Sequence, residues 1–397
     1  MDKYIVSGFI GPTPKLRKGL KNLICNQSYK DMKDCGLDSI ISISFGEDKF
    51  PKEYKQQFDY AEKNDIKVIV IDEKCYMHCE SDLIGFEKEK KYENIKSFGG
   101  LLLGDEPSAK QFDKLAILNK AFYKVYPDST AYINLLPIWA GNALLSGDDN
   151  VQVSYEKHIE EFLEKVNPKY LSYDLYPFIG EFPYIREEYF ENYSIISKYA
   201  KKYNKSIHSF LQTTSYMAGV RMPNKEEMLY ETEVALVYGV TGFFFFTWNV
   251  PVSTFPKGES YTSSIMDING NKTERYYFAK ECVNIIRLCE KALANAEHLG
   301  VIAKGNSPAK ISSSISENRV DNLVRISSNH CIAGVFEDDK NIFLFVINNS
   351  LTECAEVRIE LKNGREIELV NSKKYNETKN MDLKLFVGDY VLIKYKK

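Results

Sequence analysis

Polar and aromatic side chains gather where eight apolar stretches of the sequence end. Two of these ends carry adjacent carboxylates, Asp105 with Glu106 and Asp72 with Glu73, and a third carries Asp174 among tyrosines. The other ends supply amides, hydroxyls and rings, among them Asn134, Trp139, Gln212, Thr213, Tyr216, Thr247, Trp248 and Asn249. Carboxylates among amides and flat rings are typical of glycosidic bond cleavage. One carboxylic acid protonates the leaving oxygen, while a second carboxylate attacks the anomeric carbon or activates water.

Other chemistries lack their characteristic residues. His208 lies inside an apolar stretch, and the sequence has neither a Gly-x-Ser-x-Gly motif nor a phosphate-binding loop. Residues 75–79 hold Cys75, His78 and Cys79, but no second ligand pair follows at zinc-finger spacing. We therefore expect no metal and no cofactor. A metal-dependent isomerase is the weakest alternative, because it needs a cluster of His, Asp and Glu ligands.

Composition and charge argue against several classes of binding partner and cellular location. The 397-residue chain has a formal net charge of −3, which argues against a general binder of nucleic acid or anionic membrane. Its longest apolar run, residues 242–248, is too short to span a bilayer, and the N-terminus does not resemble a signal peptide. The eight scattered cysteines do not indicate a disulfide framework. A cytoplasmic protein with a carbohydrate substrate is the expectation, and its oligomeric state is left open.

The elements that must position these residues alternate between strand and helix up to residue 298. Apolar runs predict strands at residues 4–9, 39–45, 67–71, 100–103, 130–136, 170–175, 207–212 and 242–248. Helical spacing predicts helices at residues 52–64, 109–125, 155–166, 188–203, 225–238 and 271–296. Strands that are apolar almost throughout indicate a parallel sheet buried on both faces, and eight of them close a (β/α)8 TIM barrel. A doubly wound open sheet is the rival, but the turn after the first strand lacks its glycine-rich fingerprint.

The pattern changes after residue 298. Short strands are predicted at residues 331–336, 342–348, 355–361, 367–371 and 381–395, separated by Asp, Asn and Gly turns. We expect an α/β chain of two domains, a barrel over residues 1–298 and a small antiparallel β-sandwich over residues 299–397. In a barrel of this type the active site lies at the C-terminal ends of the strands, which is where the polar residues occur. The sandwich is expected to brace the barrel.

Several of these segments resemble clan A glycoside hydrolases, and in particular beta-galactosidase-like barrels. Residues 104–107, Gly-Asp-Glu-Pro, resemble the Asn-Glu-Pro acid/base motif of that clan, and Trp248 resembles its aromatic floor under the sugar. Residues 229–248 and the turn at residues 268–273 look like the corresponding region of those barrels. The resemblance extends to the whole chain as an architecture, although its specific motifs cover only a small part, and no single family matches.

The resemblance implies that Glu106 is the general acid/base. Its pKa must then be raised toward neutral pH, and the neighbouring Asp105 would help through like-charge repulsion. Alternate side chains of an extended chain point to opposite faces, so we expect only one of the two to face the cleft. The alternative is that Glu106 caps the following helix, with Pro107 and Ser108 beside it.

The sequence departs from the clan at the seventh strand. Where the clan has its nucleophilic Glu, this chain has Gln212, which cannot act as a carboxylate. Asp174, at the end of the sixth strand, is the best replacement, with an ion pair or a helix cap as its other possible role. The separation of the two carboxyl groups would decide between retention and inversion, and a substrate-assisted route through an N-acetyl group is also open.

The remaining candidates would bind substrate. Rings and amides at the strand ends could contact the sugar or could be ordinary packing, and the set is Trp248, Asn134, Gln212, Tyr176, Trp139 and Tyr216. The main hypothesis is therefore a glycoside hydrolase in which Glu106, Asp174 and Asp105 form the catalytic group. Because of Gln212, the second hypothesis is a carbohydrate-binding protein on a glycosidase barrel that has lost catalysis.

Overall fold

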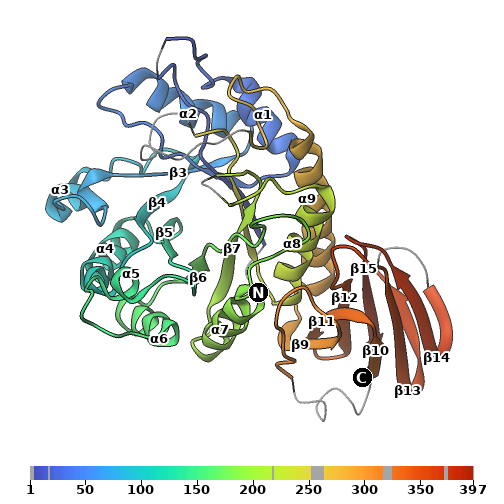
Figure 1. The fold of residues 1–397 in the computed structure, drawn as a ribbon. Coiled ribbons are helices and arrows are strands. Elements are labelled where there is room, and N and C mark those ends of the chain that lie inside the picture. Colours follow the sequence, from blue (N-terminus) through green and yellow to red (C-terminus); the bar gives the residue numbers. More distant parts are fainter. Residues whose placement is uncertain are drawn as a thin grey trace.

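The first part of the chain is a closed barrel of parallel strands (Figure 1). The computed structural model describes residues 4–16, 18–216, 219–251, 263–315, 324–370 and 374–396. Within these ranges each of eight strands pairs in parallel with the next, and β1 closes on β8. The strands are β1 (Ile5–Phe9), β2 (Ser39–Ile41), β3 (Lys67–Val70), β4 (Phe98–Asp105), β5 (Thr130–Leu135), β6 (Tyr170–Tyr173), β7 (Ser206–Gln212) and β8 (Gly242–Phe246). The predicted TIM barrel is confirmed.

Several strands are shorter than predicted. The second, sixth and eighth end at Ile41, Tyr173 and Phe246, and the predicted residues beyond them belong to loops. The apolar residues just beyond a strand end continue to pack: Ile43 after β2 and Ile71 after β3 lie against the cluster that fills the barrel. Hydrophobicity reports burial, whereas the end of a strand depends on where backbone pairing stops, so the two diverge at the mouth.

Helices surround the barrel. They are α1 (Asn26–Cys35), α2 (Pro51–Lys63), α3 (Leu83–Glu89), α4 (Phe112–Val125), α5 (Asn142–Ser146), α6 (Tyr155–Val166), α7 (Tyr189–Lys202), α8 (Lys225–Val237) and α9 (Glu274–Leu293), with the 3-10 turns η1 (Glu73–Cys75) and η2 (Ala109–Gln111). The six predicted helices are present within three residues of their expected ends. The helices α1, α3 and α5 were not predicted, because α3 and α5 are too short for a clear period and α1 is mostly polar.

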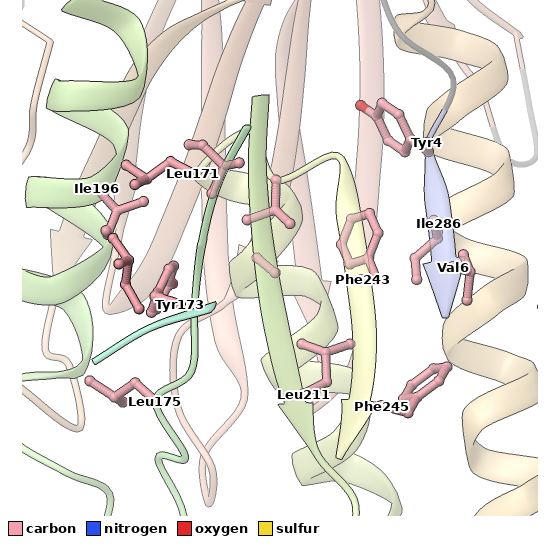
Figure 2. Packing of buried hydrophobic residues seen from close by; sticks show 14 of the residues in the cluster. Tyr4, Val6, Leu171, Tyr173, Leu175, Ile196, Leu211, Phe243, Phe245 and Ile286 are labelled. Carbon is pink, nitrogen blue, oxygen red and sulfur yellow. The ribbon is translucent and has the colours of Figure 1, made fainter. Parts of the chain in front are cut away.

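Each barrel strand is buried on both faces. Inward side chains fill the barrel with rings such as Tyr132, Tyr170, Phe210 and Phe244. Outward side chains pack against the helices; Figure 2 shows Leu171 and Phe243 in this outer layer. This two-sided burial explains why the strands read as continuous apolar runs.

The C-terminal part is an antiparallel β-domain. In its described residues seven strands form one sheet: β9 (Glu297–Gly305), β10 (Val324–Ser328), β11 (His330–Glu337), β12 (Asn341–Asn348), β13 (Ala355–Leu369), β14 (Lys374–Leu385) and β15 (Tyr390–Lys396). The first part of β13 pairs with β10 and β14, while its end pairs with β15. The sheet therefore folds around a core of its own, which contains Ile359, Val335, Leu344 and Ile393.

The β-domain corrects the predicted strands in detail. The predicted strands at residues 355–361 and 367–371 belong to a single strand, β13, whose pairing with β14 is interrupted by a register shift between Glu360 and Arg365. The predicted strand at residues 381–395 is instead two strands, β14 and β15, separated by a turn at Gly388. Turn residues occur both within β13 and between β14 and β15. The pairing partners of the flanking residues decide which of these turns reverses the chain. The domain division at residue 298 stays a prediction.

The helix α8 lies between the barrel and the β-domain (Figure 1). Every residue from 227 to 237 is buried. Tyr230 Oη donates to Asn349 Oδ1 of the β-domain at 2.8 Å, and the carbonyl of Val237 lies 3.0 Å from His298 Nε2. The two parts are therefore joined through a helix with almost no solvent-facing side. Among the helices described, none is long and apolar enough to cross a bilayer.

Candidate active site

The floor of the site is a row of polar residues in register across three strands. Asp105 on β4 pairs with Asn134 on β5, and Asn134 pairs with Ser172 on β6. Ser172 Oγ donates to Asn134 Oδ1 at 3.1 Å, which turns the Asn134 amide nitrogen toward the mouth. That nitrogen donates to Asp174 Oδ1 at 3.0 Å and lies 3.4 Å from Asp105 Oδ1. One amide therefore holds two carboxylates side by side.

Glu106 joins this pair through an unusual backbone conformation. Its φ is +49°, in the left-handed region that few residues other than glycine adopt, and its N–H donates to the Asn134 carbonyl at 2.9 Å. The chain therefore stops being extended directly after Asp105. Both Asp105 and Glu106 lie close enough to Asp174 to raise its pKa, and the expectation that only one of them faces the cleft stays a prediction. Strand alternation does not continue through a left-handed residue.

Among the described residues, neither Glu106 nor Asp174 caps a helix, and no ion pair of Asp174 occurs there. Ser108, with Gln111, forms the capping box of η2, so Glu106 is not the cap. The N-terminal cap position of α7 is Glu188, which leaves Asp174 outside any cap. Asp174 instead accepts a hydrogen bond from Asn134 at 3.0 Å, and the phenol of Tyr176 acts to lower its pKa.

All three carboxyl groups have raised pKa values. Burial raises the pKa of Asp105 to about 6. Glu106 lies at the exposed rim of the site, and partial burial of its carboxyl group, and then repulsion by Asp105, raises its pKa to about 7. Burial, together with Glu106 and Asp105, raises the pKa of Asp174 well above its usual value. The site therefore keeps a proton near neutral pH, as a general acid requires.

Aromatic side chains form one wall of the mouth. Tyr176 packs on Phe246 with ring centroids 4.7 Å apart, and Tyr216 lies 5.5 Å from Tyr176 and 5.3 Å from Phe246. Phe9 stacks on the other side of Phe246 at 5.8 Å. The peptide bond between Phe246 and Thr247 is cis. The two predicted tyrosines are thus brought together near Asp174.

Trp248 and Trp139 do not join that wall. Trp248 is 1% exposed and packs in the outer layer, with its ring 6.0 Å from that of Tyr276 on α9. Trp248 is two positions after Phe246, so both share a strand parity, but the chain has already left the strand between them. Trp139 is 44% exposed on the loop after β5, where the guanidinium of Arg186 lies 5.2 Å from its ring centre.

Gln212 is buried and its amide is fully occupied. Its nitrogen donates to the carbonyls of Phe178 (3.2 Å) and Arg221 (2.6 Å), and its oxygen accepts from the Phe178 N–H at 3.0 Å. Its own backbone N–H donates to Glu231 at 2.8 Å. The side chain therefore ties the loop after β6 to the loop after β7, and the structure does not bring it to the carboxylates.

Sequence reasoning missed three residues of the site. Phe246 and Ser172 were treated only as strand residues, and Tyr76, whose phenol interacts with Asp105, was passed over in a Cys-rich loop. Inward parity along β6 could have identified Ser172, since it alternates with Asp174 and Tyr170. No sequence signal distinguishes Phe246 from its neighbours in the run of four phenylalanines that ends β8.

Among the described residues, no group of three or more His, Cys, Asp or Glu side chains is arranged to hold a metal ion. Asp72, the other acidic candidate, caps η1 and accepts a hydrogen bond from Tyr92 at 3.0 Å. Glu73 is exposed. The acidic chemistry of the described mouth is therefore concentrated at Asp105, Glu106 and Asp174.

Comparison with solved structures finds glycoside hydrolases. The chain is similar to a candidate alpha-galactosidase from Bacteroides fragilis, with a TM-score of 0.55 and 11% identity, covering 100% of this chain and 79% of that one. It is also similar to a beta-galactosidase from Marinomonas ef1 (TM-score 0.49, 9% identity, 73% of this chain and 60% of that one). A family 5 mannosidase from Rhizomucor miehei gives a TM-score of 0.48 at 11% identity, covering 73% and 95% of the two chains.

The similarity is one of fold. No protein-family model matches the sequence, and no curated protein matches it. At these identities the comparison establishes the architecture, a parallel barrel followed by a β-domain, and leaves the activity to be argued from the site.

Proposed function

We propose that the protein is a glycoside hydrolase that cleaves O-glycosidic bonds of an oligosaccharide or glycoconjugate by carboxylate acid/base catalysis. The observation that carries this proposal is the convergence of Asp105, Glu106 and Asp174 at the C-terminal mouth of the barrel, with raised pKa values and an aromatic wall beside them. Separated roles for paired carboxyl groups are the chemical requirement of glycosidases.

Glu106 is the proposed general acid. No hydrogen-bond donor stabilises its ionised form among the described contacts of its side chain, and its pKa of about 7 leaves a proton to transfer to the glycosidic oxygen. Asp105 is proposed to maintain that pKa by repulsion. Once the leaving group has departed, Glu106 as carboxylate accepts a proton from the incoming water in a retaining route.

Asp174 is the proposed partner carboxylate. The hydrogen bond from Asn134 favours the ionised form of Asp174 and so acts against the burial and repulsion that raise its pKa, and Asn134 is then a positioning residue rather than a direct sugar ligand. Asp174 would attack the anomeric carbon, activate a water, or orient an N-acetyl group of the substrate, and all three routes need it beside the acid. Tyr176, Tyr216 and Phe246 are the proposed face for the sugar ring.

A second candidate function is a carbohydrate-binding protein without catalysis. It is favoured by Gln212, which occupies the place of the clan nucleophile and is committed to the backbone of two loops. The two functions predict the same binding but opposite results for turnover.

The test is hydrolysis of a pool of unactivated oligosaccharides, read by mass spectrometry. Wild type is compared with Glu106→Gln, Asp174→Asn and, as the matched control, Glu73→Gln, whose exposed carboxylate lies outside the site. We expect wild type and the control to release sugar, and the other two variants to lose about 10²–10⁴-fold in rate. Equal cleavage by all four proteins would show that the site is wrong, and binding without any cleavage would favour the second function.

A further inference from the structure

Aromatic side chains stand in solvent on the two loops that leave the site. Trp139, on the loop after β5, is 44% exposed, and Phe182 and Tyr184, on the loop after β6, are 50% and 48% exposed. These loops begin after Leu135 at the end of β5 and after Tyr173 at the end of β6, so the exposed rings lie on the same side of the barrel as the carboxylates. We call Trp139, Phe182, Tyr184 and Arg186 the loop platform.

The platform is connected to the site through Arg186. Its guanidinium lies 5.2 Å from the centre of the Trp139 ring, which links the loop after β5 to the loop after β6. The Arg186 Nε donates to the Tyr176 carbonyl at 3.5 Å, and the Arg186 backbone N–H donates to the Pro177 carbonyl at 2.9 Å. Arg186 therefore connects the exposed indole to the backbone of Tyr176, two residues after Asp174.

The part of the platform on the loop after β6 is held in place by hydrogen bonds from Arg221 and Gln212. Arg221 donates to the carbonyls of Ile179 (2.7 Å) and Tyr184 (2.6 Å) and pairs with the buried Glu227. Gln212 joins this loop after β6 to the loop after β7 through the carbonyls of Phe178 and Arg221. Exposed rings on a loop with this many internal bonds lose little conformational freedom when a ligand arrives, which is what a preformed binding surface requires.

We propose that the loop platform binds additional sugar units of the substrate, so that the substrate is a chain of several units rather than a short glycoside. The proposal rests on the proposed function, because the chain is taken to continue from the bond at Asp174. An indole ring offers a flat apolar face to a sugar ring, and a guanidinium beside it can donate to several hydroxyl oxygens. The segment that carries Phe182 and Tyr184 also carries the charged residues Glu181, Arg186 and Glu187, unlike the continuous apolar patch of a protein interface.

The experiment measures affinity against chain length without turnover. Glu106→Gln is titrated by calorimetry with cello-, manno-, xylo- and chito-oligosaccharides of two to six units. The same titrations are made with Trp139→Ala and, separately, Phe386→Ala added. Phe386 is the matched control because it is 57% exposed in the β-domain and has the Lys384 amine 5.6 Å from its ring centre.

We expect affinity in one series to increase with length, and Trp139→Ala to weaken the longest member about tenfold, as for a central aromatic contact. The disaccharide and the Phe386→Ala protein should show no change. Equal affinity for two and six units, or equal loss in both variants, would overturn the platform, as would a panel in which no member binds. Length-dependent binding that needs Trp139, together with no hydrolysis by the protein with Glu106 intact, would keep the platform and remove the catalytic proposal.

Discussion

At the scale of single residues, the backbone of Glu106 decides the character of the site. A non-glycine residue with φ of +49° at the end of a strand is uncommon, and such residues cluster at functional sites where their surroundings hold them. Here the conformation is held by the bond from the Glu106 N–H to the Asn134 carbonyl. It brings Asp105 and Glu106 toward Asp174. Repulsion among these carboxylates adds to the effect of burial and raises the pKa values of Glu106 and Asp174.

The pH profile of the Asp105→Asn variant tests this electrostatic coupling. A general acid is active while protonated, so kcat/KM should fall as pH rises through the Glu106 pKa of about 7. Removal of the Asp105 charge leaves the effect of burial but removes the repulsion, so the pKa of Glu106 decreases. The alkaline limb of the profile should then move to lower pH, whereas Glu73→Gln should leave it in place. An alkaline limb unchanged in Asp105→Asn would mean that Glu106 is not the titrating acid.

At the scale of elements, Gln212 connects the ends of β6 and β7. The spacing of the sequence correctly put Gln212 at the end of the seventh strand, but not the direction of its amide. That direction depends on the loops after both strands, whose carbonyls at Phe178 and Arg221 accept its two N–H groups. A long-range contact of this kind leaves no local pattern, and the substrate-binding role expected for Gln212 finds no support in its surroundings.

Placing a carboxylate at position 212 is therefore expected to destabilise the protein and to give no increase in hydrolysis. In Gln212→Glu, carboxyl oxygens would face two carbonyls, at a cost of about 2–4 kcal/mol in the free energy of unfolding. Because burial favours the protonated form, the loss should grow as pH rises. Urea denaturation at pH 5 and pH 8 measures it, with the exposed Gln152→Glu as a control of unchanged stability. A Gln212→Glu protein as stable as wild type and faster in hydrolysis would contradict this assignment.

At the scale of the whole molecule, the β-domain and the barrel share one packed interior. The largest hydrophobic cluster includes Val237 of α8 and Phe345 of β12, and Gly334 of β11 lies against the backbone of α8. The order of strands and helices, and hence the barrel, could be predicted because a strand that is buried on both faces has a continuous apolar sequence. The interface between the barrel and the β-domain could not be predicted in this way. The helix α8 is buried all round, and its sequence does not show which neighbour covers which side.

A single substitution at this interface should destabilise the whole protein. A Cβ on Gly334 would lie 2.6 Å from the Val237 carbonyl oxygen and 2.9 Å from its Cα, so Gly334→Val forces backbone atoms apart. We expect a loss of about 1–3 kcal/mol and a lower Tm in a single calorimetric transition. Gly141→Val is the matched control, since nothing lies within 4 Å of its added Cβ. Two separate transitions in wild type, or equal Tm values in both variants, would show that the domains are independent.

The placement of Trp139 and Trp248 has a spectroscopic consequence. They are the two tryptophans of the sequence, one exposed beside a guanidinium and the other 1% exposed in the outer layer of the barrel. Their fluorescence therefore separates into a red-shifted emission, which iodide can quench, and a blue-shifted emission that is shielded from it. The first reports what touches the mouth of the barrel and the second whether the barrel is folded, so the protein carries an intrinsic probe for each question.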